Sequence, residues 1–220
     1  LHHAYLLTGT RGVGKTTLAR ILAKAINCSN LDQGEPCNQC SSCLAITSGQ
    51  FADVIEIDAA SRTKVEDTRE LLSNVQYAPT HGKNKVYIID EVHMLSGHSF
   101  NALLKTLEEP PAHVIFLLAT TDPQRLPITV LSRCLQFHLS PLPDTTICQQ
   151  LEWILQQQGC ASDSTAVKLI TEAADGSMRD ALSLLDQALA GNQNSLSLEL
   201  VQQMLGCVPS NQIDELLSFI

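Results

Sequence analysis

The sequence has no long apolar run, few aromatic residues and no excess of positive charge. Its apolar stretches fall far short of the ~20 residues that a membrane-spanning helix needs. Leu1-His2-His3 lacks the basic start and apolar centre of a signal peptide. We therefore expect a cytoplasmic protein that has no membrane partner. The formal net charge of -9 opposes indiscriminate binding to phosphate backbones, so contact with DNA would need a local basic patch or partner subunits.

The eight cysteines do not favour a disulfide framework, because the cytosol keeps thiols reduced. Cys28, Cys37, Cys40 and Cys43 are spaced as C-x8-C-x2-C-x2-C, and four thiolates can close a tetrahedral shell around zinc. An iron-sulfur cluster uses similar ligands, and free thiols are the third interpretation. Four bound thiolates leave no open position for a substrate, so the metal would stabilise the fold and not catalyse. The other four are scattered and are interpreted as packing residues: Cys134, Cys148, Cys160 and Cys207.

Apolar runs of strand length alternate with helical patterns through the first part of the chain. These runs are Ala4 to Leu7, Val54 to Ile57, Val86 to Ile89, Val114 to Ala119 and the weaker Leu135 to Leu139. Such alternation predicts parallel β-α-β units. The third and fourth runs lack polar alternation, as central strands do when helices cover both faces. The pattern therefore predicts an α/β fold with a doubly wound, parallel, five-stranded sheet.

The pattern changes at Ser140-Pro141-Leu142-Pro143-Asp144, where two prolines prevent helix continuation and Asp144 can cap the next helix. Beyond this point only helical periodicity remains. The predicted helices are Thr145 to Gln158, Asp163 to Ala174, Ser177 to Leu189 and Leu198 to Leu205. We expect an α/β domain over residues 1–141, a small helical domain over 142–206 and the start of a further, truncated domain over 207–220.

A phosphate-binding loop is predicted where Gly9-Thr10-Arg11-Gly12-Val13-Gly14-Lys15-Thr16 matches G-x-x-x-x-G-K-[ST], between a strand and a helix over Thr17 to Ala25. Its backbone N–H groups would surround the β-phosphate of ATP at a helix N-terminus. Lys15 would reach the β- and γ-phosphates, and the Thr16 hydroxyl would bind Mg²⁺. The alternative is a Gly-rich turn of chance composition, which the strand and helix on its two sides disfavour. The candidate nucleotide-binding residues are Gly9, Thr10, Arg11, Gly12, Val13, Gly14, Lys15, Thr16 and Thr17.

A second part of this site is predicted at the end of the Val86 to Ile89 run, where Asp90 and Glu91 follow. Carboxyl ends of strands in open α/β sheets line one crevice, so these carboxylates would face the phosphate-binding loop. Asp90 would hold Mg²⁺ through its water shell, and Glu91 would polarise the attacking water as general base. A solvated acidic turn is the alternative. No other carboxylate cluster suits two-metal nucleotidyl transfer.

The acidic pair resembles the water-activating pair of AAA+ ATPases, whereas a nucleotide kinase, which also has such a loop, must keep water out. Thr121, at the end of the next predicted strand, resembles the polar sensor that contacts the γ-phosphate or the lytic water; a simple strand cap is the alternative. His93 follows the acidic pair. We interpret it as the start of a packed turn, with a catalytic role as the less favoured alternative.

Further motifs make the resemblance more specific. Ser132-Arg133-Cys134 is similar to the Ser-Arg-Cys motif of clamp-loader subunits, and Gly176-Ser177-Met178-Arg179-Asp180-Ala181 to the start of their lid helix. Asp58 to Val65 and Asn101 to Pro111 also match the gamma/tau subunit family of bacterial DNA polymerase III. The resemblance implies an AAA+ fold with a helical lid. It also implies that Arg133 acts in trans on a neighbour's ATP and that Arg179 contacts the γ-phosphate bound in its own subunit.

The resemblance also implies cofactors and partners. The cofactors are ATP, Mg²⁺ and a structural Zn²⁺, which would be bound in a module at about residues 27–48. The chain would be one subunit of a hetero-oligomeric pentamer in bacteria, associated with the nucleoid. The partners would be other loader subunits, the sliding clamp, primed DNA and, for a tau form, the polymerase core. DNA-directed DNA polymerase activity, a transferase activity, would belong to the holoenzyme and not to this chain. Weaker candidates for DNA contact are Arg62, Lys64 and Lys105.

Two other functions share part of this pattern. Another AAA+ DNA motor, such as a branch-migration helicase, would have the loop, the acidic pair and the sensors but would lack the four cysteines and Ser-Arg-Cys. A catalytically silent clamp-loader scaffold would keep the fold and the zinc module without binding nucleotide. Intact Lys15, Thr16, Asp90 and Glu91 argue against the scaffold.

Overall fold

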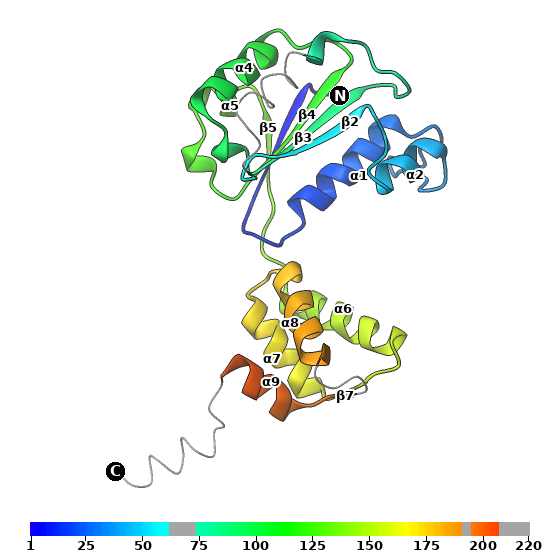
Figure 1. Cartoon of the computed structure of the whole chain (residues 1–220), viewed down its shortest axis with the longest axis vertical. Helices are drawn as coiled ribbons and strands as arrows, with labels where there is room; N and C mark the ends of the chain where they lie inside the picture. The colour runs from blue at the N-terminus through cyan, green and yellow to red at the C-terminus, as the bar shows by residue number, and fades with distance from the viewer. Residues whose placement is uncertain (62–73, 191–194, 207–220) are drawn as a thin grey trace. The chain divides into compact units, whose positions relative to one another are not determined.

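The first part of the chain folds around one five-stranded sheet in the computed structural model, which describes residues 1–61, 74–190 and 195–206. All strands are parallel, in the order β2-β3-β4-β1-β5 (Figure 1). The strands are β1 (Ala4–Thr8), β2 (Val54–Asp58), β3 (Lys85–Asp90), β4 (Val114–Thr120) and β5 (Leu135–His138). The five predicted runs are thus confirmed as the strands of a single parallel sheet.

Helices cover both faces of this sheet, with α1 (Lys15–Asn27) and α2 (Ser41–Thr47) on one side and α4 (Gly97–Glu108) and α5 (Ile128–Leu131) on the other (Figure 1). Alternate residues of β3 supply two cores. Val86 and Ile88 pack with Ala19 and Ala23 of α1. The intervening residues of β3 pack in the other core with Leu103 of α4. Because both faces are covered, the doubly wound prediction is confirmed.

Strand β4 lies between β1 and β3, and all seven of its residues are buried. Thr8 at the end of β1 pairs with Thr120 at the end of β4. On the other side, Ile89 of β3 pairs with Leu118. The three strands therefore end nearly level. The segments that follow them emerge at one edge of the sheet, which is where open α/β sheets bind ligands.

The described residues from Ser140 onward form a small helical unit around a core of its own. Its elements are α6 (Asp144–Gln157), β6 (Ala161–Ser162), α7 (Ser164–Ala174), α8 (Met178–Ala190), β7 (Ser195–Leu196) and α9 (Leu198–Leu205). The core joins α6, α7, α8 and α9 through residues such as Leu151, Ile170, Leu185 and Val201. The prediction that a small helical bundle follows the sheet is confirmed.

Two details of the helical unit differ from the sequence predictions. Strands β6 and β7 pair in parallel over two residues each, where only helices were expected; so short a strand leaves no periodicity to detect. The proposed cap at Asp144 is also wrong, because α6 begins at that residue and its N-cap is Pro143. The proline ring fixes φ of Pro143, which is −61°, and the carbonyl of Pro143 accepts the N–H of Thr146 at 2.9 Å.

By their internal contacts the described residues fall into two compact units. One contains Leu1–Gly9 and Gly14–Leu139; the other contains Thr10–Val13 and the chain from Ser140 onward. No helix in the described part of the chain is long and apolar enough to cross a membrane.

Asp53, just before β2, anchors the loop that leads into β3. Its carboxylate accepts backbone N–H groups from Thr80, His81 and Gly82, each at 2.7 Å, and the residue is only 2% exposed. Burial acts to raise the pKa of Asp53, but the three N–H donors outweigh it and hold the pKa below its ordinary value. The loop therefore depends on an ionised, buried carboxylate.

We predict that Asp53→Asn lowers the free energy of unfolding by roughly 1–3 kcal/mol at pH 7, since the amide turns an N–H₂ group toward backbone donors. The pKa of Asp53 is lower in the folded state than in the unfolded state. Its carboxylate therefore contributes to stability above the unfolded-state pKa of about 3.9, and this contribution is lost as the pH falls through the folded-state pKa. Urea unfolding at pH 7 and below pH 4 measures this. Asp58→Asn, whose side chain receives one backbone N–H from Ala60, is the control. Equal losses in the two variants would contradict the prediction.

Candidate active site

The phosphate-binding loop leads from β1 into α1 through backbone conformations that favour glycine. Gly14 is the N-cap of α1 and has a left-handed φ of 93°. Gly9 has a φ of 148°, and a Cβ added there would lie 2.4 Å from the carbonyl oxygen of Leu139. A side chain at Gly9 would therefore collide with backbone, and the motif's glycines have a steric reason for being there.

Lys15, the first residue of α1, is turned inward. Its exposed fraction is 6%, and its Nζ donates to the carbonyl oxygen of Gly9 at 3.0 Å. Burial lowers the pKa of Lys15, while the negative charges of Glu91 and Asp90 act to raise it. The ammonium group thus lies at a helix N-terminus with two carboxylates close enough to affect its pKa, a setting suited to a phosphate and its counter-ion.

Asp90 and Thr16 meet directly. The Thr16 hydroxyl, in the first turn of α1, donates to Oδ2 of Asp90 at 2.5 Å. The other carboxylate oxygen, Oδ1, accepts the N–H of Glu91 at 2.9 Å. A hydroxyl and a carboxylate oxygen are hard ligands of the kind that Mg²⁺ takes in phosphoryl-transfer sites, so the two residues fit the ion that the sequence predicts.

Glu91 adopts a left-handed backbone conformation, with φ 47° and ψ 46°, which is uncommon for a residue with a long side chain. Its Oε2 accepts two hydrogen bonds from Thr121, one from the N–H at 3.1 Å and one from the hydroxyl at 2.9 Å. Strained conformations of this kind persist only where the surroundings hold them, and they concentrate at functional sites. The structure therefore brings the predicted base and the predicted sensor into contact.

His93 lies in the same cluster, although the sequence favoured a packing role for it. The 3-10 turn η2 (Val92–Met94) brings its ring back toward the strand ends. Nδ1 lies 2.9 Å from Oγ1 of Thr120 and 3.3 Å from Oε2 of Glu91. The sequence signal that could have placed His93 at the site is its position two residues after the predicted base, Glu91. Nothing local in the sequence could show which strand end the ring would meet.

The two predicted arginines come from other elements of the chain. Arg133, just after α5, donates to Oε1 of Glu108 at 2.8 Å and to the carbonyl oxygen of Thr129 at 2.7 Å, with its side chain 32% exposed. Arg179 lies in the first turn of α8, in the helical unit. There Gly12 is its neighbour, since a Cβ added to Gly12 would lie 3.4 Å from the Arg179 Cβ.

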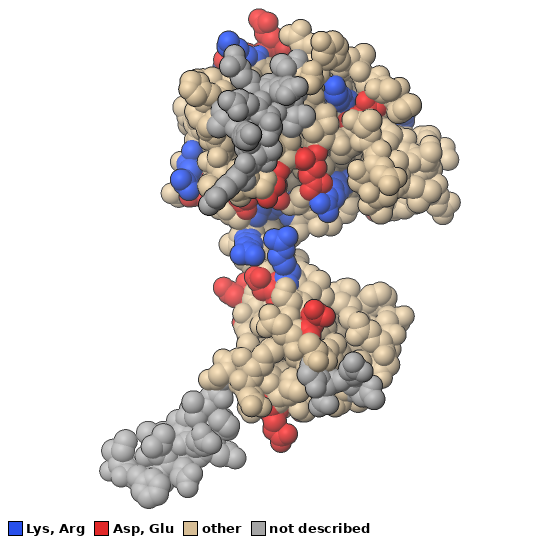
Figure 2. All heavy atoms as spheres, viewed as in Figure 1, with Lys and Arg blue, Asp and Glu red and all other residues tan. Residues whose placement is uncertain are grey.

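The remaining candidates are distributed as follows. Thr10, Arg11 and Thr17 are exposed, and Val13 is buried. Lys105 is exposed in the last turn of α4. Arg62 and Lys64 lie outside the described residues. On the face drawn in Figure 2, the coloured Lys and Arg side chains of the sheet-containing unit are interspersed with Asp and Glu and do not form a continuous basic stripe.

The four clustered cysteines converge where α1 ends and α2 begins. Their Sγ atoms all lie within 4.8 Å of one another, and those of Cys28 and Cys37 are 3.5 Å apart. Four sulfurs at 2.3 Å from one zinc ion would be about 3.8 Å apart, so the set fits tetrahedral zinc. Among the described residues the other cysteines, Cys134, Cys148 and Cys160, lie outside this set; Cys207 lies beyond the described part.

Backbone N–H groups point at these sulfurs. The N–H of Cys37 donates to Sγ of Cys28 at 3.4 Å, and that of Cys40 to Sγ of Cys37 at 3.3 Å. Backbone hydrogen bonds from Ser29 and Cys43 lower the pKa of Cys40 to about 5. Burial instead raises the pKa of Cys43 to about 12. The backbone hydrogen bonds therefore favour the thiolate form of Cys40. A bound cation would ionise the buried thiol of Cys43.

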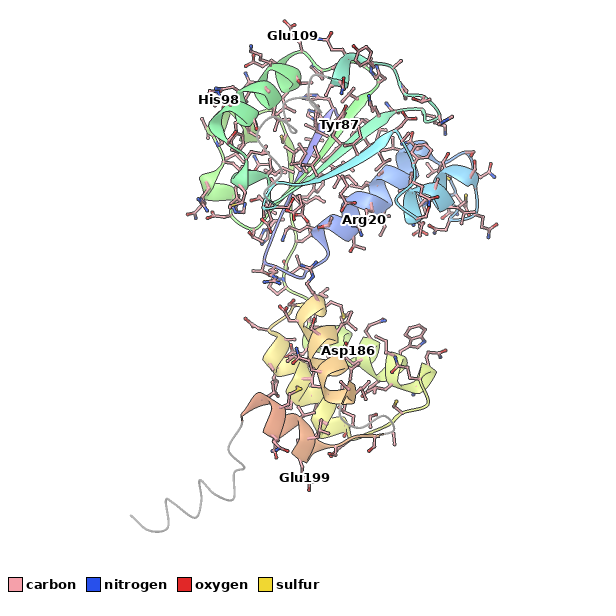
Figure 3. All side chains as sticks on the ribbon, viewed as in Figure 1. Arg20, Tyr87, His98, Glu109, Asp186 and Glu199 are labelled. Atoms are coloured by element: carbon pink, nitrogen blue, oxygen red, sulfur yellow. The ribbon has the colours of Figure 1, made fainter. Side chains whose placement is uncertain are left out.

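An ion pair ties the helix of the phosphate-binding loop to the edge of the sheet. Arg20 on α1, labelled in Figure 3, donates from Nε and Nη2 to the two carboxylate oxygens of Glu56 on β2, at 2.9 and 2.6 Å. This planar, two-pronged pair raises the pKa of Arg20 through the hydrogen bonds with Glu56. It supports the orientation of α1 against β2 rather than any chemistry.

Comparison with known proteins gives a consistent result along the chain. Residues 1–143 match the family described as DNA polymerase III, delta subunit, and residues 146–194 match the DNA polymerase III clamp loader subunit, ATPase lid domain. The chain is 62% identical to DNA polymerase III subunit tau of Salmonella typhimurium over 96% of its own length and 33% of that protein. It is 48% identical to the Bacillus subtilis subunit tau, over 97% and 38% respectively.

The chain therefore spans about a third of the tau relatives that it matches. Among solved structures, the Thermotoga maritima RuvB Holliday junction branch migration motor is similar, with a TM-score of 0.63 and 20% identity over 94% of this chain and 61% of that one. At this identity the likeness concerns the fold alone.

Proposed function

Because the chain belongs to the DNA polymerase III gamma/tau clamp-loader family, we propose that it is the ATP-hydrolysing part of a loader that places a sliding clamp on primed DNA. The observation that carries the proposal is the cluster of Lys15, Asp90, Glu91 and Thr121 at one edge of the sheet. ATP binding would order the subunit within a pentamer so that the assembly opens the clamp and grips DNA. Hydrolysis would release both.

The roles within the site follow from its contacts. Lys15 and the loop residues Gly9–Thr17 would bind the phosphates, while Thr16 and Asp90, already in contact, would hold Mg²⁺. The ion would supply positive charge to the phosphoryl oxygens. Glu91, oriented by the hydroxyl and N–H of Thr121, would accept the proton of the attacking water. Arg179 would contact the γ-phosphate in the same subunit.

Arg133 suits a role in the neighbouring subunit. Its side chain is engaged on its own chain by Glu108 and the Thr129 carbonyl, and it has no contact with Lys15, Asp90 or Glu91 among the described residues. Exposed ion pairs of this kind contribute little to stability. Exchange of Glu108 for a neighbour's phosphate would therefore cost this chain little.

Other partners belong to the proposal with less support. The remaining loader subunits, the clamp, DNA and, for a tau form, the polymerase core are inferred from the family, as is a place at the bacterial nucleoid. Lys105, which is exposed, remains a candidate for DNA contact. So do Arg62 and Lys64, outside the described part. A branch-migration motor is the second candidate, favoured by the shared fold; the four-cysteine cluster and the 62% identity to tau favour the loader.

We propose that Cys28, Cys37, Cys40 and Cys43 bind one structural Zn²⁺. The mutual Sγ separations within 4.8 Å and the N–H groups aimed at the sulfurs support this. With four protein ligands, the ion would have no position for a substrate. It would stabilise the junction between α1 and α2.

We predict one zinc per chain in protein purified without added metal, because four thiolates complete its coordination. Cys40→Ser should lose the metal and unfold at lower temperature, whereas Cys160→Ser, outside the cluster, should keep both. Elemental analysis and thermal unfolding measure this. Substoichiometric metal in the parent, or unchanged stability of Cys40→Ser, would refute the assignment.

Lys15→Ala and Glu91→Gln should separate binding from chemistry. Removing the Lys15 charge should weaken ATP binding, whereas Glu91→Gln should bind ATP normally and lose turnover by about 10²- to 10⁴-fold, as expected for a general base. ATP titration and hydrolysis by the reconstituted complex with clamp and primed DNA measure the two effects. Lys24→Ala, which alters a half-buried lysine near the other end of the same helix, is the control. Normal hydrolysis by Glu91→Gln would exclude it as the base.

Arg133→Ala should leave ATP binding to its own chain unchanged and suppress hydrolysis at the adjacent subunit's site, by ~10³- to 10⁵-fold if it acts as a finger. Arg179→Ala should act in the subunit that carries it. Complexes with one altered subunit at a time distinguish these effects. Arg20→Ala, which removes another surface ion pair, is the control. A defect confined to the site of the subunit that carries Arg133→Ala would exclude action in trans.

A further inference from the structure

Among the described residues, the hydrogen bonds of the Glu91 carboxylate fall on one of its two oxygens, and the charge of Lys15 also acts on the carboxylate. Oε2 accepts from the N–H and the hydroxyl of Thr121 and lies 3.3 Å from Nδ1 of His93. Among the described residues Oε1 has no hydrogen-bond partner. A carboxylate held by one oxygen keeps the lone pairs of the other free, and a general base needs a free lone pair to accept the proton of water.

His93 is itself held in place from β4. Its side chain is 9% exposed, and Nδ1 lies 2.9 Å from the hydroxyl of Thr120, a residue with no exposed surface. The Thr120 hydroxyl also accepts the N–H of Asp122 at 3.1 Å. The ring is therefore connected to the same strand end that supplies Thr121, and it has little freedom to turn away from Glu91.

The hydroxyl of Thr120 can pair with Nδ1 in either tautomer, so the nearby Glu91 carboxylate distinguishes the two. An unprotonated Nδ1 would direct its lone pair at a carboxylate oxygen 3.3 Å away, which is repulsive. With a proton on Nδ1, the N–H donates to Oγ1 of Thr120 at 2.9 Å, and its positive end also attracts Oε2 of Glu91 at 3.3 Å. The surroundings thus favour the Nδ1–H form, whichever state Nε2 adopts.

We propose that His93 is a positioning residue for ATP hydrolysis, whose Nδ1–H holds Oε2 of Glu91 so that Oε1 faces the attacking water. Thr121 and His93 approach Oε2 from different elements, the end of β4 and the turn η2. Together they restrain a side chain whose backbone is in the left-handed region. This role rests on the proposed function, in which Glu91 is the base.

Substitutions at His93 can separate the contribution of Nδ1 from that of ring packing. The side-chain amide nitrogen of asparagine can take the place of Nδ1, whereas that of glutamine reaches the place of Nε2. In the full-length protein, assembled with the other loader subunits, clamp and primed DNA, His93→Gln should lower kcat by about 10- to 100-fold, as a misplaced base does. KM and ATP affinity should stay within about twofold. His93→Asn should restore most of kcat.

His98→Gln is the matched control, since His98 is exposed on α4, where Figure 3 labels it. If the parent complex hydrolyses ATP and His93→Gln is equally active, the positioning role is wrong while the proposed function stands. A parent complex that hydrolyses no ATP would overturn both. Equal losses in His93→Asn and His93→Gln would indicate packing only, and would also overturn the role of Nδ1.

A measurement without nucleotide or turnover tests the same contact. Imidazole ¹⁵N spectra of the parent chain should show His93 protonated at Nδ1. Its signals should change in Thr120→Val, which removes the hydroxyl, and in Glu91→Gln, but not in His98→Gln. A ring protonated at Nε2 alone would overturn the proposal, and this result does not depend on whether the His93 variants fold.

Discussion

The structure depends on the hydrogen-bonded pairing of β4 with β1 on one side and β3 on the other. All seven residues of β4 are buried, so each of its backbone N–H and C=O groups has to be satisfied within the sheet, because leaving one unpaired is costly. This requirement sets the register of β1 and β3 against the same strand. The segments that leave the ends of the three strands are consequently brought to one edge with little freedom to separate.

The chemistry at that edge follows from this register. The phosphate-binding loop leaves β1, Asp90 and Glu91 leave β3, and Thr120 and Thr121 end or follow β4. The middle strand therefore supplies the groups that orient a carboxylate from its neighbour. Because Thr121 directly follows the buried strand β4, its donors are in position before any ligand arrives, as the proposed proton transfer from water to Glu91 would require.

Helix α1 runs from the phosphate-binding loop to the cysteine cluster. Lys15 begins the helix and Asn27 ends it, directly before Cys28, so thirteen residues, or about 20 Å, separate the phosphate-binding end from the cysteine cluster. At the cysteine end, Asn27 Oδ1 accepts the N–H of Asn84 at 3.0 Å, and Lys83 Nζ donates to the carbonyl oxygen of Cys28. These contacts hold the far end of the helix, where the cluster lies too distant to take part in the proposed phosphate chemistry.

Local patterns in the sequence were enough to predict the five strands, the helical lid and the convergence of the four cysteines, because each is encoded by neighbouring residues. They also indicated which residues would form the site, whose roles stay predictions. Tertiary structure alone decided that His93 meets Thr120, that Glu91 meets Thr121 and that Arg133 pairs with Glu108. These partners are 25 to 30 residues apart. Their meeting depends on strand order, on register and on the left-handed turn at Glu91, none of which has a local sequence signature.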